Sequence, residues 1–318
     1  MGNPNQPVHK ILVALDMTEL NISYAIDHGV DMVISHHPFL FKPIHDIDLS
    51  TCKGRMIENL IRHRITSFAA HTNLDSAVQG VNDALAEKLG LQECKGFVPV
   101  MTYSSYKFTL YITAAHAKLL KKKLDSLRGK DIESYYVVDD ADDFTENIRV
   151  EFRVPGQLVK QVKDMISSLD KSAKYDVYKL VNHGYKETMG RIGKFPFPMS
   201  VEEALSYIKN KLEIPVLRYA GNRDRLVEKI AILGGAGAEF AGVAKSMGAD
   251  LYLTGDLKYH EAQDAAMNGL VIADGGHFYT ERVIIPYLAK RLRDEFKTRG
   301  WNVGVLEDVR AKDIFHCV

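Results

Sequence analysis

Imidazole and carboxylate side chains gather directly after three predicted strands of this 318-residue chain. The candidates are His36, His37, His71, Asp75, His277 and Glu281. His277 and Glu281 are four residues apart, which places them on one face of a helix that begins near His277. Because open α/β sheets bind ligands at the carboxyl ends of their strands, we expect these side chains to meet at one sheet edge.

Three of these histidines (His36, His37 and His277) and the two acids, with no cysteine among them, are typical of a metal site. Nitrogen and oxygen donors suit Zn²⁺, Fe²⁺, Mn²⁺ or Co²⁺ in a position that water can reach. This donor set exceeds the needs of one four-coordinate zinc ion and matches two ions bridged by a carboxylate. Such a pair can hold a hydroxide nucleophile and polarise an oxygen of the substrate. The sequence therefore predicts a dinuclear centre with hydrolytic chemistry.

Each cluster taken alone also has a simpler interpretation. Residues 35–38, Ser-His-His-Pro, could form a polar loop in which one imidazole is hydrogen-bonded. Asp75 could merely cap a helix that begins near Val78. Only the combination of the clusters favours a metal site.

Two further motifs follow predicted strands in the last third of the chain. The glycine turn at 234–237 could hold an anion with its amides. It lacks the GxGxxG and P-loop patterns, so a tight strand-to-helix turn is the favoured interpretation. Lys258 and His260 could donate protons or contact a substrate, or they could simply begin a surface helix.

The outer thirds of the chain alternate short apolar runs with helical patterns, which indicates parallel sheets covered on both faces. The predicted strands are 10–15, 31–35, 65–70, 229–233, 250–254 and 270–273. The predicted helices are 19–28, 53–64, 81–89, about 238–248, 259–267 and one from about 277. Pro286 should kink or break the last of these helices.

The same spacing occurs in both outer thirds of the chain. The start of one predicted strand and the Gly-X-Asp segment at the next strand are 19 residues apart, from Lys10 to Gly29 and from Lys229 to Gly248. The repeat is either a chance likeness of two β-α-β units or a pseudo-symmetric pair of lobes with a site between them. We predict the second: an α/β fold in which lobes 1–102 and 188–318 form one split core domain.

The middle of the chain, 103–187, is predicted to form a smaller α+β insert. Strands at 106–113, 133–138, 148–154 and 175–180 alternate with helices at 116–127 and 156–169, which is typical of a ferredoxin-like sandwich. The acidic run 139–143 and the lysine run 121–123 are expected to be solvated.

Composition excludes several classes of protein. The chain has 41 Lys and Arg against 41 Asp and Glu, so it lacks the positive charge of a nucleic-acid or membrane-surface binder. No apolar run reaches the roughly 20 residues of a membrane span, and the first residues do not resemble a signal peptide. Cys52, Cys94 and Cys317 have no zinc spacing and are expected to be incidental thiols of a cytoplasmic protein.

At these motifs the chain resembles the NIF-three-like family, whose bacterial members are often called GTP cyclohydrolase I type two homologues. The matching segments are 33–38, 70–75, 254–256 with 259–260, and 274–277 with Glu281. They occur in order, with their spacing intact, over both outer thirds.

The resemblance implies a dinuclear metal centre, a toroidal homohexamer with its metal sites on an internal cavity, and an insert similar to the PII and CutA sandwiches. The implied ligands are His36, His37, Asp75, His277 and Glu281, with Glu281 as the bridge. The insert is shorter than usual. The helix and Trp-Asp-Asn stretch that usually precede the first strand are absent, so we expect a truncated start or a differently covered core; the single Trp is Trp301.

Two functions follow. The first is a metal-dependent, GTP cyclohydrolase-like hydrolase of a small heterocyclic or nucleotide-like substrate, with His260 or His71 moving protons or orienting ligands. The second is a metal-binding regulatory or sensor assembly without turnover, which rests on analogy with PII-like sandwiches.

Overall fold

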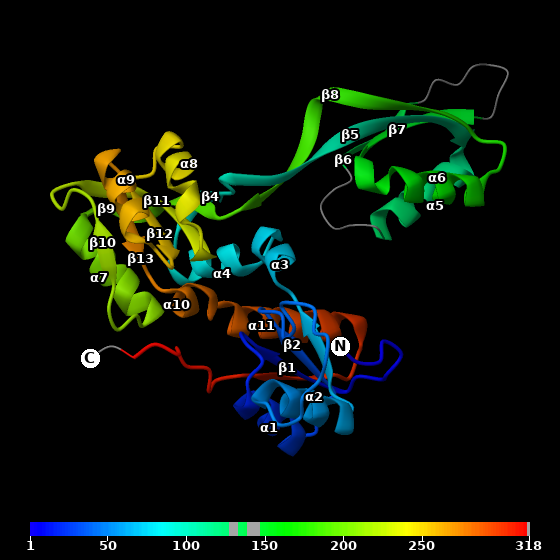
Figure 1. Cartoon of the computed structure of the whole chain (residues 1–318). Helices are drawn as coiled ribbons and strands as arrows, with labels where there is room; N and C mark the ends of the chain where they lie inside the picture. Colours follow the sequence, from blue (N-terminus) through cyan, green and yellow to red (C-terminus); the bar gives the residue numbers. More distant parts are fainter. Residues whose placement is uncertain (127–132, 139–146, 317–318) are drawn as a thin grey trace. The chain divides into compact units, whose positions relative to one another are not determined.

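The computed structural model describes residues 1–126, 133–138 and 147–316. The acidic run 139–143 and Cys317 lie outside the described residues. The chain divides into two compact units, which are described separately (Figure 1). The first unit joins Met1–Val98 to Thr188–Val318, and the second is Pro99–Glu187.

The first unit contains a four-stranded parallel sheet in the order β14-β1-β2-β3. Its strands are β1 (Lys10–Ala14), β2 (Met32–Ser35), β3 (Thr66–Ala69) and β14 (Gly304–Glu307). Its helices are α1 (Glu19–Asp27), α2 (Cys52–Arg62) and α11 (Ile284–Arg299). Leu12 packs into a cluster with side chains of α1 and α2, whereas Ile11 and Val13 pack with side chains of α11. This sheet is therefore covered on both faces, as predicted.

The first unit also contains a six-stranded sheet in the order β10-β13-β12-β11-β9-β4. Its strands are β4 (Gln92–Lys95), β9 (Arg191–Ser200), β10 (Arg218–Ala220), β11 (Leu226–Ala236), β12 (Leu251–Gly255) and β13 (Val271–Asp274). Strands β11, β12 and β13 are parallel, while β9, β10 and β4 pair antiparallel. Its helices are α4 (Val81–Lys88), α7 (Val201–Leu212), α8 (Ala241–Ser246) and α9 (Tyr259–Met267).

The two sheets correct one expectation. The strands that precede the chemical motifs do not share a single sheet edge, because β2 and β3 belong to the four-stranded sheet and β13 to the six-stranded one. Hydrophobic periodicity identifies a strand but not its partner, since pairing depends on residues far apart in the sequence.

The C-terminal helical region is broken at the predicted proline-containing segment. Helix α10 (His277–Glu281) ends five residues before Pro286, and α11 begins at Ile284. Pro286 thus lies in the first turn of α11, where a missing backbone N–H costs no helical hydrogen bond. Within the described part of the chain, no helix is both long and apolar enough to cross a membrane.

The second unit is a four-stranded sheet with two helices, in the strand order β6-β7-β5-β8. Its elements are β5 (Val98–Thr113), α5 (Ala114–Ser126), β6 (Glu133–Val138), β7 (Asn147–Pro155), α6 (Val159–Leu169) and β8 (Lys174–Met189). Alternate residues of β5 and β7 face a core that they share with both helices; these are Phe108, Leu110, Val150 and Phe152. Lysines 121–123 are exposed, as predicted.

Candidate metal centre

Three short segments position the candidate ligands within the first unit. His36 and His37 directly follow β2, and their backbone amides donate to the carbonyls of Ala14 and Leu15. The other candidates lie on two short helices, Asp75 on α3 (Thr72–Ser76) and His277 and Glu281 on α10. The structure therefore brings together residues from both sheets.

Asp75 does not have the capping role that was its simpler interpretation. The N-cap of α4 is Gly80, and the side chain of Asp83 accepts the nearby amide of Gln79 at 2.5 Å. The Asp75 carboxylate lies instead within the imidazole cluster, with Oδ1 at 3.5 Å from His36 Nε2.

One group of converging atoms contains His36, Asp75 and Glu281. His36 Nε2 lies 3.5 Å from Asp75 Oδ1 and 3.6 Å from Glu281 Oε1. His36 Nε2 and Asp75 Oδ1 are buried and have no hydrogen-bond partner. His36 Nδ1 donates to the Ala70 carbonyl at 2.8 Å, which leaves Nε2 facing two carboxylates as the ring nitrogen that can bind a cation. Acceptors that converge in this way are stabilised by a cation between them.

A second group contains His37, His277 and Glu281. Glu281 Oε2 lies 2.9 Å from His37 Nε2 and 3.1 Å from His277 Nε2, and the two imidazole nitrogens are 3.3 Å apart. Two ligands of one tetrahedral zinc ion are roughly 3.3–3.6 Å apart, given bond lengths near 2.0–2.2 Å. The 3.3 Å between the two imidazole nitrogens falls in this range, as do the 3.5 and 3.6 Å of the first group, whereas the two contacts of Glu281 in the second group have hydrogen-bond length. The donor types and these spacings fit a divalent ion, and Glu281 belongs to both groups.

Outer carboxylates orient both imidazoles of the second group. His37 Nδ1 donates to Asp16 at 2.7 Å, and His277 Nδ1 donates to Asp256 at 2.7 Å. Each hydrogen bond directs the remaining nitrogen, Nε2, toward Glu281, as carboxylate–histidine–metal arrangements do. Asp256 has a backbone φ of +55°, a left-handed conformation that Asp adopts more readily than most residues.

These outer partners are functional residues that the local sequence patterns did not predict. Asp16 belongs to none of the predicted motifs, and Asp256 belongs only to the segment 254–256 of the family resemblance. Asp16 lies two residues after the end of β1 and Asp256 directly follows β12, both parallel strands, so their position was a usable signal.

The ligand cluster shifts the pKa values of its members. Burial opposes charge on His37, but hydrogen bonds to Asp16 and Glu281 raise its pKa from 6.5 to about 10. The hydrogen bond to Glu281 likewise raises the pKa of His277 to about 9. Burial favours the neutral acid at Glu281, yet the imidazoles around it hold its pKa well below the ordinary value. Burial raises the pKa of Asp75 to about 6.

The glycine turn serves the site by close packing. The amides of Gly234 and Gly235 donate to Asn82 Oδ1 and Thr280 Oγ1, both at 3.0 Å, so these two amides do not hold an anion. Gly235 has a φ of +70°, and a Cβ at this position would overlap Glu281 Oε1. The turn therefore lets β11 approach the buried carboxylate closely.

The two predicted proton-transfer residues lie in different environments. The His71 ring is half-buried, with its centroid 5.3 Å from that of His36 and 5.7 Å from that of His37. Burial and the neighbouring imidazoles lower the pKa of His71. His260 is exposed on α9, and its ring contacts Tyr259. His71 forms a third candidate ligand group with His36 and His37, whereas His260 belongs to none of the groups found among the described residues.

Replacing an outer carboxylate tests the orientation of the imidazoles. We expect Asp256→Asn to weaken metal binding about 10- to 100-fold, because Asn no longer offers a charged acceptor to His277 Nδ1–H. Competition with a chromogenic chelator measures this affinity. Asp264→Asn on the exposed face of α9 is the control, and equal affinities of the two variants would contradict the role of Asp256.

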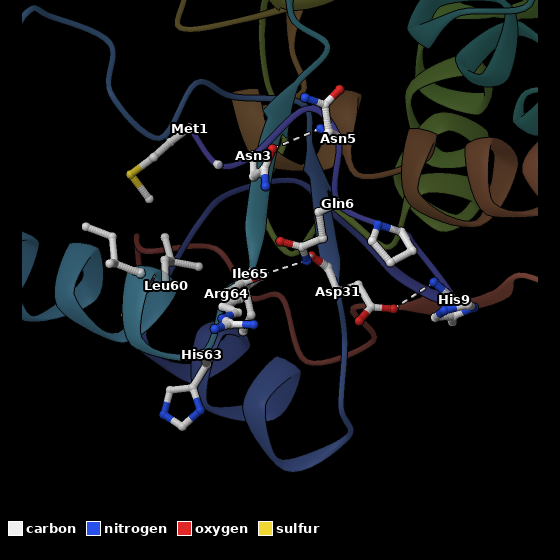
Figure 2. Close-up of a pocket in the computed structure, with 13 residues that line it drawn as sticks. Met1, Asn3, Asn5, Gln6, His9, Asp31, Leu60, His63, Arg64 and Ile65 are labelled. Atoms are coloured by element: carbon white, nitrogen blue, oxygen red, sulfur yellow. Dashed lines mark hydrogen bonds between the residues drawn. The ribbon is translucent and has the colours of Figure 1, made fainter.

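A pocket of about 670 Å³ lies at the opposite edge of the four-stranded sheet (Figure 2). The N-terminal segment and the turns before β2 and β3 line it, and Asp31 accepts the backbone amide of His9 there at 2.7 Å. This edge carries the amino ends of the strands, whereas the candidate ligands follow the carboxyl ends. The pocket is separate from the metal centre.

A family model, sequence relatives and solved structures all relate this chain to the same group of proteins. The sequence model of Duf34/NIF3 (NGG1p interacting factor 3) matches residues 1–312. A Halalkalibacterium halodurans protein named GTP cyclohydrolase 1 type 2 homolog is 33% identical, and the match covers 99% of this chain and 91% of that protein. A Bacillus cereus protein related to NIF3 has a similar crystal structure, with a TM-score of 0.85 and 33% identity over 100% of this chain and 91% of that one. A Staphylococcus aureus crystal structure gives a TM-score of 0.79 and 28% identity over 100% of this chain and 91% of that one.

Proposed function

Because the chain belongs to the Duf34/NIF3 family, we propose that its converging imidazoles and carboxylates form the metal centre of a hydrolase. The substrate class is a small heterocyclic or nucleotide-like molecule, as the name of the Halalkalibacterium relative suggests for a GTP cyclohydrolase-like reaction. The observation that carries the proposal is the pair of buried, unpartnered acceptor atoms, His36 Nε2 and Asp75 Oδ1.

The two ligand groups support two ions per subunit. Glu281 offers Oε1 to the group of His36 and Asp75, and Oε2 to the group of His37 and His277. A carboxylate that serves each group with a different oxygen has the arrangement of a bridging ligand. Nitrogen and oxygen donors suit zinc, iron, manganese or cobalt.

When bound, divalent ions would activate a water molecule as nucleophile and polarise an oxygen of the substrate. His71 is the protein group placed to move a proton, because its ring lies beside His36 and His37 and its pKa is lowered. His260 lies among exposed residues of α9, so its proposed role is a contact with substrate.

The remaining parts of the proposal concern architecture. The succession β1-β2-β3 and β11-β12-β13, parallel in both sheets, supports a pseudo-symmetric pair of lobes. The β-α-β-β-α-β order of the second unit supports a ferredoxin-like, PII- or CutA-like insert, with proposed limits at 103 and 187. Family resemblance supports a cytoplasmic toroidal homohexamer.

Elemental analysis of the native protein, coupled to a metabolite screen that includes GTP, tests the function. We expect bound divalent metal and turnover that stops when a chelator removes the metal. Metal without turnover of any metabolite would favour a regulatory or sensor assembly. A His37→Ala variant that lost its metal but kept full turnover would refute the hydrolase.

Metal uptake should release protons. In the metal-free protein the pKa values of His37 and His277, about 10 and 9, keep both rings charged at pH 7. A proton on Nε2 blocks the lone pair that would bind the ion, so affinity should rise as pH increases from about 6.5 to 9. Calorimetric titration with zinc in two buffers of different ionisation enthalpy counts the protons. Uptake without proton release, or an affinity independent of pH, would contradict this expectation.

A further inference from the structure

A pocket of about 430 Å³ lies at the carboxyl end of β13, the strand that His277 and Glu281 follow. Residues of β10, the start of α9 and the end of β13 line it, among them Arg218, Tyr219, Lys258, Tyr259 and Asp274. Its volume falls in the range of small-molecule sites. The sequence motif that contains Lys258 and His260 supplies none of the candidate metal ligands, but its Lys258 lines this pocket.

Two links connect the pocket to His277. Lys258 lies two residues after Asp256, a stretch of chain that spans at most about 7 Å. The carboxylate of Asp256 lies 2.7 Å from His277 Nδ1. On the other wall, Asp274 accepts Arg218 Nη2 at 2.5 Å and the amide of Gly276, the residue before His277, at 3.1 Å. The walls of the pocket are therefore connected to His277 through the chain at Asp256 and through the hydrogen bond of Asp274 to Gly276.

The lining combines cations with aromatic rings. The side chains of Arg218 and Lys258 are 72% and 82% exposed, so both can approach a ligand, and Lys258 Nζ lies 3.6 Å from Glu261 Oε1 in an exposed ion pair that a ligand would have to compete with. Arg218 is fixed at one nitrogen by Asp274, and its other donors form the planar fork that suits phosphate oxygens. Tyr219 and Tyr259 are 42% and 75% exposed, and each offers a ring face for a planar group.

We propose that this pocket binds a planar heterocycle that carries a phosphate, with the phosphate on Arg218 and Lys258 and the ring against the tyrosines. The inference rests on the proposed function, because it assigns the substrate class of that metal centre. It places the specificity of the reaction on the wall formed by β10 and α9.

Binding of the four 5′-nucleoside monophosphates to the full chain, measured calorimetrically with and without zinc, tests the proposal. We expect at least one of them to bind, and its nucleoside to bind about 10-fold or more weakly, since hydrogen bonds to charged groups are strong. Lys258→Ala should weaken the monophosphate about 10-fold and leave the nucleoside unchanged. Tyr259→Leu should weaken the binding of both the monophosphate and the nucleoside, whereas Tyr259→Phe, which keeps the ring, should bind both with the affinity of the unaltered protein.

Lys258→Ala is the main variant, because Arg218→Ala would leave the buried carboxylate of Asp274 without its partner. Arg223→Ala is the matched control, since Arg223 is an exposed cation paired with Glu202 outside the pocket. Metal content should be unchanged in every pocket variant, whereas failure of the proposed function would appear as absent metal or absent turnover.

Three results would overturn the pocket assignment. One is no binding of any of the four monophosphates to the unaltered protein. Another is equal affinity of Lys258→Ala and Arg223→Ala. The third is monophosphate binding that is lost when zinc is removed and is unchanged by Lys258→Ala. That result would assign the phosphate to the metal ions and leave the proposed function intact.

Discussion

A Glu281→Gln variant is expected to lose at least one bound metal ion per subunit and all metal-dependent turnover. Glu281 is 4% exposed and contributes an oxygen to two of the three candidate ligand groups found among the described residues, the group of His36 and Asp75 and the group of His37 and His277. Gln keeps the shape of the side chain but has only one acceptor oxygen, so it can serve at most one group. Because outer-sphere changes alone cost about 10- to 100-fold in affinity, loss of a shared ligand should cost more.

Elemental analysis after dialysis, together with zinc titration of the stripped protein, measures this loss. Glu295→Gln is the matched control, because Glu295 is exposed and pairs only with Arg299 on the surface of α11. Full metal content in Glu281→Gln would show that the two groups do not depend on this carboxylate, and the bridging assignment would then be wrong.

Gly235→Ala is expected to destabilise the protein and to weaken metal binding, although Gly235 is not itself a ligand. A left-handed conformation costs a residue with a Cβ about 1–2 kcal/mol. The added methyl group would also overlap Glu281 Oε1 and displace it from both groups. We expect the free energy of unfolding to fall by about 1–3 kcal/mol. Metal affinity should fall about 10-fold or more.

Gly242→Ala is the control for this substitution. Gly242 lies in α8 with no atom within 4 Å of the added Cβ, so alanine should stabilise that helix by about 0.5–1 kcal/mol. Urea unfolding of the metal-free proteins separates strain from loss of metal. If the free energy of unfolding and the metal affinity of Gly235→Ala were both unchanged, the turn would have to accommodate the added methyl group without displacing Glu281.

Local patterns predicted many of the elements in the outer thirds. Helix α9 has the predicted limits, and β1, α1 and β2 differ from prediction by one residue at an end. Local patterns did not predict α7, although Ser200 and Glu203 form a capping box at its start. They also did not predict β4, β9, β10 or β14, because pairing with distant strands defines these strands more than their own periodicity does.

The sequence by itself determined which residue types stand at the ends of the buried strands, and hence that nitrogen and oxygen ligands were available without thiolates. It also determined that His277 and Glu281 share a helical face, because four residues span about one helical turn. These inferences depend on neighbours along the chain, where spacing fixes geometry.

Only the tertiary structure decided that the ligands come from two sheets, that Asp16 and Asp256 orient the imidazoles, and that His260 lies outside the candidate ligand groups. Each of these facts joins residues more than 20 positions apart or depends on which way a helix faces. Such contacts depend on how the apolar faces of the two sheets pack. This packing depends on residues throughout the core, which no local sequence pattern describes.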